Sequence, residues 1–258
     1  MSGSVVLVEL DADGSTIRGF RHVPDTASAP VPAVLIIPGF ADTAVGPHNM
    51  HVLLARELVR AGIAVMRFDY RGQGESDGEF SRFTVQSGLD DARRAIHELA
   101  ASADVDSERL GVHGYSLGAA YAAALAAEYP EVRSLSLLSP VAWIDPVLRS
   151  FFDERHLRQA SEHGFVDWLG WPVGGALLDR PASVDPLAAI GRAQAATLVV
   201  HGTADNEVSS ENGRAYERYG AMLHEVPGAG HQWASVRIQD EVIARIVAWH
   251  KAALQTRS

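Results

Sequence analysis

Hydrophobic residues are spaced differently at the start of the chain and beyond it. Val5–Leu10 and Thr16–Val23 are β-like stretches that flank Asp11-Ala12-Asp13-Gly14, a segment whose residues tolerate the backbone angles of a tight turn. The first part of the chain therefore predicts an antiparallel hairpin.

After the hairpin, short and almost wholly apolar runs alternate with helical stretches. Runs that are apolar at every position are typical of strands buried on both faces, as in a parallel sheet between two layers of helices. The predicted strands are Ala33–Ile37, Ile63–Phe68, Leu110–His113, Leu135–Leu138, Thr197–Val200 and Met222–Val226. The predicted helices are His51–Ala61, Val85–Ala101, Leu117–Tyr129, Glu211–Tyr219 and Val236–Ala253. The alternation predicts an α/β fold with a mostly parallel, doubly wound sheet and an antiparallel edge.

The alternation stops between Pro140 and Thr197, where no clear strand is visible. A structureless loop of that length is rare in a compact domain, so we expect a small inserted cap subdomain over residues 141–195, with the core formed by 1–140 and 196–258. The insertion is rich in aromatic residues, which could fill its own core or line an apolar acyl or aryl pocket. The candidates for contact with substrate are Trp143, Phe151, Trp168 and Trp171.

Composition narrows the classes of function. The 258 residues include 22 basic and 32 acidic ones, and the formal net charge of −10 argues against a nucleic-acid partner. Lys251 is the sole lysine, so a Walker-type phosphate loop is excluded and a lysine Schiff base is improbable. The absence of cysteine excludes disulfides, thiolate nucleophiles and cysteine-based zinc sites.

The N-terminal residues have no basic segment before an apolar stretch, and Glu9 interrupts the apolar residues that are present. No apolar run approaches the roughly 18–20 residues that cross a bilayer. We therefore expect a cytoplasmic protein that does not associate with membranes. The oligomeric state is left open.

Gly114-Tyr115-Ser116-Leu117-Gly118 lies between a predicted strand and an Ala-rich helix. In that context Gly-x-Ser-x-Gly is typical of a sharp, strained turn that presents a nucleophilic serine, because larger neighbours would collide with adjacent elements. The following helix would direct its N-terminal N–H groups at an oxyanion. The alternative is a glycine-rich turn with an incidental serine, but the strand and helix around the motif favour Ser116 as a nucleophile.

A serine hydroxyl needs a base, itself oriented by a carboxylate, to act as a nucleophile near neutral pH. His231 lies in the loop after the last predicted strand, and Asp205 follows the strand before it. All three residues follow the carboxyl ends of predicted parallel strands, where open α/β sheets bind their ligands. Their order along the chain, Ser116, Asp205, His231, is the order found in α/β-hydrolases. We expect a catalytic triad.

An acyl-transfer site also needs two backbone donors for the oxyanion. Leu117, which follows the nucleophile, would supply one N–H group. The loop after the first parallel strand, Ile37-Pro38-Gly39-Phe40-Ala41-Asp42, would supply the other, and Phe40 has the right position.

Other motifs receive structural interpretations. Gly72-x-Gly74 resembles the start of a dinucleotide-binding loop, but the third glycine is missing and no helix opens there, so we expect this loop to support the active-site strand ends. His113 and His201, at the ends of buried strands, are expected to be hydrogen-bonded core residues. No group of His, Asp and Glu has zinc-site spacing. We expect no metal and no cofactor.

Taken together, these motifs resemble those of the α/β-hydrolase superfamily over essentially the whole chain. The segments PGFAD, DYRGQGES, GYSLG, HGTAD and GAGH occur in the superfamily's order. Within it, RFDYRGQGESDGEFSRFTV resembles the cinnamoyl/feruloyl esterase group, which also carries an inserted subdomain. Two positions depart from that pattern: Pro38 replaces the usual histidine of the oxyanion loop, and Leu117 replaces the usual glutamine or methionine.

These features predict a serine hydrolase that cleaves small acyl or aryl carboxylic esters through an acyl-enzyme. A thioesterase or acyltransferase, a peptidase and a C–C hydrolase could use the same residues. A non-catalytic ligand-binding member of the fold is a further alternative, although such a protein would not need all three triad residues.

Overall fold

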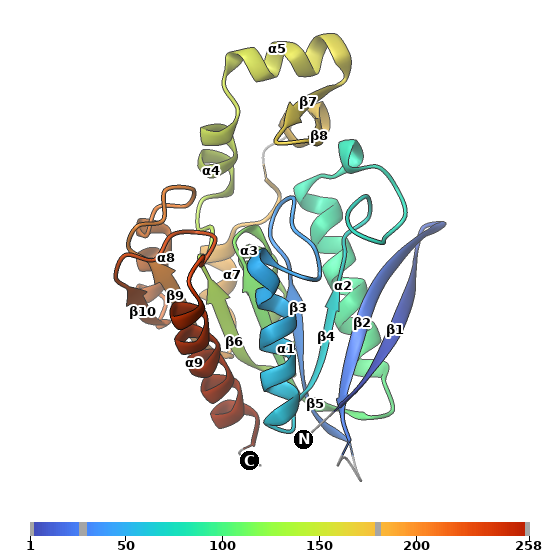
Figure 1. Ribbon diagram of the computed structural model, residues 1–258, viewed down its shortest axis with the longest axis vertical. Helices are drawn as coiled ribbons and strands as arrows, with labels where there is room; N and C mark the ends of the chain where they lie inside the picture. The colour runs from blue at the N-terminus through green and yellow to red at the C-terminus, as the bar shows by residue number, and fades with distance from the viewer. Residues whose placement is uncertain (1–2, 26–29, 179–181, 256–258) are drawn as a thin grey trace.

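The computed structural model describes residues 3–25, 30–178 and 182–255. The parts of the predicted core and insertion at 1–2, 26–29, 179–181 and 256–258 lie outside these ranges. Figure 1 shows a central sheet with helices around it and a group of smaller elements beyond one end of the strands.

Within the described ranges, eight strands form one sheet in the order β1-β2-β4-β3-β5-β6-β9-β10. β1 pairs with β2 and β2 with β4 in antiparallel fashion, and the remaining pairs are parallel. The α/β prediction, with its N-terminal hairpin, is therefore confirmed. The strands are β1 (Gly3–Ala12), β2 (Ser15–Pro24), β3 (Val31–Ile37), β4 (Ala64–Phe68), β5 (Val105–Tyr115), β6 (Val132–Leu138), β9 (Ala196–Gly202) and β10 (Met222–Val226).

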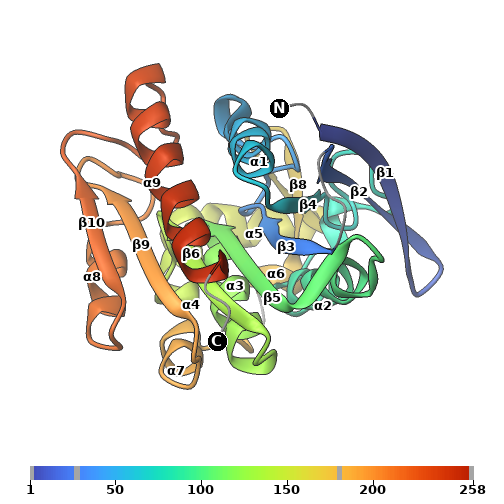
Figure 2. The ribbon, with the colours of Figure 1, turned by 90° about the horizontal axis from the view of Figure 1, so that it is seen from below.

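Helices cover both faces of this sheet (Figure 2). α1 (Met50–Arg60) and α9 (Val236–Gln255) lie on one face, and the helices on the other are α2 (Val85–Ala101), α3 (Leu117–Glu128), α7 (Pro186–Ile190) and α8 (Glu211–Glu217). Successive residues of a strand point to opposite faces. Val34 and Ile36 of β3 accordingly pack with α1 and α9, whereas Leu35 packs on the side of α2 and α3. This is why the central strands are apolar at every position.

Two short 3-10 helices precede longer helices: η1 (Pro47–Asn49) leads into α1, and η2 (Phe80–Arg82) comes shortly before α2. A capping box begins α2, in which the Thr84 side chain accepts a hydrogen bond from the Ser87 N–H and the Ser87 hydroxyl accepts one from the Thr84 N–H. Such caps satisfy N–H groups that have no partner inside the helix. Of the helices in the described chain, none is long and apolar enough to cross a membrane.

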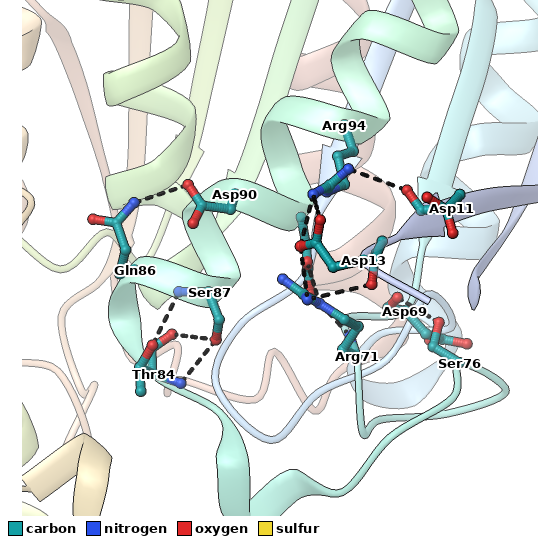
Figure 3. Close-up of polar contacts among 12 residues, drawn as sticks. Asp11, Asp13, Asp69, Arg71, Ser76, Thr84, Gln86, Ser87, Asp90 and Arg94 are labelled. Atoms are coloured by element: carbon teal, nitrogen blue, oxygen red, sulfur yellow. Dashed lines mark hydrogen bonds and ion pairs between the residues drawn. The ribbon is translucent and has the colours of Figure 1, made fainter. Parts of the chain in front are cut away.

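Ion pairs attach the turn between β1 and β2 to the loop after β4 and to α2 (Figure 3). Asp13, in the turn between β1 and β2, pairs with two arginines. Its carboxylate lies 3.5 Å from Nη1 of Arg71 and 2.9 Å from Nη2 of Arg94. Arg71 also donates to the fully buried Asp91 of α2 at 2.8 Å. These contacts join the turn of β1–β2, the loop after β4 and α2 into one unit.

The chain between β6 and β9 carries α4 (Ile144–Phe151), α5 (Glu154–His163), β7 (Phe165–Trp168), β8 (Trp171–Gly174), α6 (Gly175–Leu178) and α7. Most of these elements lie beyond one end of the sheet strands in Figure 1. The expectation of no strand in this segment is wrong, because β7 and β8 form an antiparallel hairpin. Each strand has four residues, too few for a periodic signal, and the turn at Leu169-Gly170 lacks the usual Asn-Gly or Asp-Gly pair. The division into core and cap stays a prediction.

Candidate active site

Ser116 lies at the junction of β5 and α3, where the backbone takes φ 54° and ψ −120°. Positive φ is unfavourable for a residue with a side chain, so the turn must be held by its surroundings. A Cβ atom at Gly114 would lie 2.5 Å from the Gly118 carbonyl oxygen, and one at Gly118 would lie 2.2 Å from the Pro38 carbonyl oxygen. Both glycines are therefore required by close backbone approach. The Ser116 N–H donates to the Leu138 carbonyl at 2.9 Å, which fixes the turn against β6.

The structure brings Ser116, His231 and Asp205 together. His231 Nε2 lies 3.0 Å from Ser116 Oγ, and His231 Nδ1 lies 2.7 Å from Asp205 Oδ2. All three residues are buried. Because an ionised carboxylate only accepts hydrogen bonds, Nδ1 carries the proton and Nε2 is free to accept the serine proton. This arrangement can transfer a proton from the serine to the imidazole.

The Asp205 carboxylate is fixed from two sides. Oδ1 accepts backbone N–H groups from Glu207 at 3.0 Å and Val208 at 2.8 Å, while His201 Nε2 lies 3.3 Å from Oδ2. Burial raises the pKa of Asp205, but the hydrogen bonds from His201 and His231 outweigh it and hold the pKa well below its usual range. Asp205 is therefore ionised and held in one orientation at neutral pH.

The loop after β3 runs alongside the nucleophile, and a Cβ atom at Gly39 would lie 3.1 Å from the Ser116 Cβ. The Tyr70 hydroxyl donates to the Pro38 carbonyl at 2.9 Å, and the Gly39 N–H donates to Asp42 at 3.3 Å. Asp69 accepts the Ala44 N–H at 2.6 Å. The loop is thus held by buried polar contacts, two of which come from the segment after β4, as predicted for a supporting loop.

Phe40 lines the cavity at Ser116. Leu117 is the first residue of α3, and the N–H groups of the first helical turn have no partner inside the helix. Positive partial charge at that helix end favours an anion there. The two predicted oxyanion donors therefore lie on the two segments that adjoin Ser116.

A cavity of about 470 Å³ opens beside Ser116 and His231. Five aromatic residues, Phe40, Tyr115, Phe151, Trp168 and Trp171, are among the residues that line it. Some of these rings contact one another: the ring centroids of Phe40 and Phe151 lie 5.3 Å and 5.7 Å from that of Trp168. Three of the four aromatic residues predicted to contact substrate, Phe151, Trp168 and Trp171, line this cavity. The fourth, Trp143, does not: it is 44% exposed and lines a separate depression beside α7.

Sequence reasoning missed several residues around the site. The Tyr115 hydroxyl donates to the His231 carbonyl at 3.0 Å and so ties the histidine loop to the nucleophile strand. Glu207 and Gln232 line the cavity and hydrogen-bond to each other at 2.9 Å. Tyr115 stands in the motif next to Ser116, so its position was a usable signal, but a surface carboxylate such as Glu207 carries no pattern of its own.

Five of the ten other histidines are buried, and they include His113 and His201. His113 Nδ1 lies 2.8 Å from Ser136 Oγ, and His201 Nε2 donates to the Val208 carbonyl at 2.9 Å, so both are hydrogen-bonded core residues as predicted. His201 additionally reaches Asp205, which the sequence did not indicate. In the described part of the chain, no three His, Asp or Glu side chains are grouped in a way that could hold a metal ion.

Comparison with known proteins gives the family and the fold of this chain. Residues 28–168 match the family Hydrolase_4, described as serine aminopeptidase S33. An uncharacterized protein of Mycobacterium tuberculosis is 34% identical over 236 residues, which cover 89% of this chain and 73% of that protein. Esterase FrsA of Yersinia pestis is 33% identical over 134 residues, covering 50% of this chain and 30% of that protein.

Among solved structures, Est1E from Butyrivibrio proteoclasticus with bound ferulic acid superimposes with a TM-score of 0.84. The two chains are 21% identical, and the match covers 96% of this chain and all of Est1E. Such a likeness establishes the fold, and the match over 28–168 establishes the family. This chain therefore belongs to the Hydrolase_4 family, serine aminopeptidase S33, and has the α/β-hydrolase fold.

Proposed function

We propose that this protein hydrolyses small acyl or aryl carboxylic esters, with Ser116 as the nucleophile, His231 as the general base and acid, and Asp205 as the group that orients His231. The observation that carries the proposal is the chain of two hydrogen-bond distances, 3.0 Å from Ser116 Oγ to His231 Nε2 and 2.7 Å from His231 Nδ1 to Asp205 Oδ2. A protein that only bound a ligand would not need this arrangement.

In the first half of the reaction, Ser116 Oγ attacks the ester carbonyl carbon while its proton passes to His231 Nε2. The N–H groups of Phe40 and Leu117 stabilise the resulting oxyanion. The intermediate collapses, the alcohol leaves with the proton from Nε2, and an acyl-Ser116 ester remains. Water then attacks this ester, gives a proton to Nε2, and the proton returns to Ser116 as the acid departs. Removal of one oxyanion donor typically costs about 10²–10³ in turnover.

The aromatic rings of the cavity favour binding of an uncharged substrate group that is flat or apolar. Phe40, Phe151, Trp168 and Trp171 supply rings on several sides, and aromatic walls with a few polar groups are typical of small-molecule sites. Est1E, which has the same fold, binds ferulic acid. We therefore place hydroxycinnamate esters among the first substrates to be tested, and residues 141–195 are the cap that shapes the pocket.

A peptidase reaction is the second candidate. The family description names a serine aminopeptidase, and an aminopeptidase needs an anionic group to hold the substrate ammonium. Glu207 lines the cavity and could serve as that group.

The test is turnover of p-nitrophenyl esters of graded length, methyl ferulate, an acyl thioester and an aminoacyl p-nitroanilide. Ser116→Ala should abolish all but a small residual rate and also prevent labelling by a fluorophosphonate probe. Ser134→Ala is the matched control, because Ser134 is fully buried in β6 and its hydroxyl has no hydrogen-bond partner among the described residues. Near-normal ester turnover by Ser116→Ala would refute the proposal, and preference for the anilide would favour the peptidase.

A further inference from the structure

A second depression, with a volume of about 320 Å³, lies between α1 and the first two strands. Figure 2 shows α1 beside the β1–β2 hairpin on one face of the sheet. None of the residues lining this depression lines the cavity at Ser116. Its polar side chains are those of Ser4, His22, Arg56, Arg60 and Arg67. All of its lining residues belong to the described chain, and none of them is acidic.

Arg67 is the most deeply placed of these cations, with 7% of the residue exposed. Its Nη1 donates to the Ala44 carbonyl at 3.0 Å, its Nε donates to His22 Nε2 at 2.9 Å, and its guanidinium carbon lies 4.5 Å from the centre of the Phe20 ring. In the described part of the chain, no carboxylate lies within ion-pair distance of Arg67. Asp69 acts on it only at longer range. A buried charge is costly unless an opposite charge or several hydrogen bonds compensate it.

The hydrogen bond from Arg67 determines the state of His22. Because Nε of an arginine always donates, His22 Nε2 must accept, so the proton of the neutral ring is on Nδ1. Burial, together with the positive charges of Arg67 and Arg56, lowers the pKa of His22 to about 4. The imidazole is therefore neutral at pH 7 and presents an N–H donor.

The remaining arginines differ in how they are neutralised. Arg60 forms an ion pair with Glu57, one helical turn away. Arg56 is exposed on α1 and forms no ion pair within the described ranges. Other arginines of the described chain also form no ion pair, Arg237 among them, but Arg56 and Arg67 line one depression together. Two such cations in a lining that holds no carboxylate favour an anion as the ligand.

We propose that this depression binds a small molecule through a phosphate or carboxylate group, with Arg56 and Arg67 as the charged contacts and His22 as a neutral donor. Guanidinium groups suit such oxyanions because they present parallel N–H donors. Val52 and Val59 form an apolar wall that can contact the rest of the molecule. The observations that support this site do not rest on the ester hydrolysis proposed above.

Arg67 also links the depression to the catalytic centre. It donates to the Ala44 carbonyl, and the N–H of the same residue donates to Asp69. Ala44 follows Phe40 in the loop beside Ser116, so an anion that fixes Arg67 also restrains that loop.

The test is binding of inorganic phosphate, pyrophosphate and succinate to the whole protein, measured by isothermal calorimetry and by the rise of the melting temperature. Sodium chloride at equal ionic strength serves as the control, because general screening would act in both salts. We expect saturable binding of at least one oxyanion, with the melting temperature rising as the ligand concentration exceeds Kd. Preference between the phosphates and succinate identifies the group that is recognised.

Arg56→Gln is the informative variant, since Arg56 is exposed and its loss should not prevent folding. We expect it to weaken binding about tenfold or more, the usual effect of losing one charge-assisted hydrogen bond. Arg237→Gln, which removes an exposed arginine of α9 outside the depression, should bind like the wild type. Equal affinity of Arg56→Gln and the wild type, or no oxyanion binding beyond the effect of chloride, would overturn the proposal.

Discussion

The strand ends that carry Ser116 and the insertion that lies over them are built in opposite ways. Around Ser116 the backbone is so crowded that two glycines have no room for a Cβ atom, and the neighbouring polar groups are buried. In the insertion, α5 has no buried residue, and Leu169 at the β7–β8 turn is 83% exposed. The two regions therefore have different roles. Close packing around Ser116 holds the reacting groups in one geometry, while the more exposed insertion supplies part of the pocket wall.

The largest effect should come from the crowded region. Asp205→Asn leaves the shape of the site nearly unchanged but removes the negative charge that holds the proton on His231 Nδ1. We expect ester turnover to fall roughly 10⁴-fold with the folded state retained. Assays with p-nitrophenyl acetate would measure the turnover, and circular dichroism would measure whether the variant is folded. Loss of less than tenfold would mean that Asp205 does not orient the histidine.

The two regions should also differ in their tolerance of a single methyl group. Gly118→Ala places a Cβ atom against the Pro38 carbonyl, so we expect a loss of about 3 kcal/mol in the free energy of unfolding. Gly164→Ala is the matched change in the insertion, where φ is +82° and no atom lies within 4 Å of the added carbon. It should cost about 1 kcal/mol, the price of positive φ alone. Urea unfolding would compare the free energies of unfolding of the two variants. Equal losses would contradict the difference in crowding between the two regions.

Changes in the pocket wall should alter selectivity with little effect on the chemistry. Trp168→Leu removes a ring that contacts Phe40 and Phe151, so we expect kcat/KM for an aryl ester to fall about tenfold relative to that for an acetate. Trp143→Leu is the control, because Trp143 lies outside the cavity. If both variants changed the ratio equally, Trp168 would not contact substrate.

The change expected within a single pH unit is small. Burial lowers the pKa of His250 to about 3, whereas an unfolded histidine titrates near 6.5. As pH falls below 6.5, the unfolded state takes up a proton that the folded state refuses, so stability is lost, by at most about 1.4 kcal/mol per pH unit. His250→Gln should make this decline shallower. His163→Gln, which changes an exposed residue of α5, should leave the decline as it is in the wild type. The free energy of unfolding, measured between pH 7 and 4, tests this. The same dependence on pH in both variants and the wild type would mean that the burial of His250 has no such effect.

Much of the fold could be predicted because its central strands are buried on both faces. The predicted run Ala33–Ile37 lies within β3, in which every residue after Val31 is buried. The helix Val85–Ala101 coincides with α2, and Met222–Val226 coincides with β10, although β10 is only partly buried. The predicted strand at Leu110 was too short: β5 begins five residues earlier, at Val105, and the residues 106–109 in between are polar and not fully buried. The β7–β8 hairpin was missed for the opposite reason, because its two short strands bury little besides Val166 and Val173.

The candidate site divides in the same way. Ser116, Asp205 and His231 could be named from the sequence because each follows a strand whose carboxyl end must reach the same edge of the sheet. The contact of His201 with Asp205 and that of Tyr115 with the His231 carbonyl depend on distances between strands and loops that no spacing along the chain encodes.

The sequence by itself therefore determined the order of elements, the sharp turn at Ser116 and the set of groups that could react, since these follow from local sterics and hydrophobic period. Only the tertiary structure decided which aromatic rings of the insertion reach the cavity. It also decided that Arg56, Arg67 and His22 share one depression whose lining, in the described part of the chain, holds no acidic residue. Those outcomes depend on how segments far apart in the chain pack together, and packing is decided by the sum of many contacts that a linear pattern does not contain.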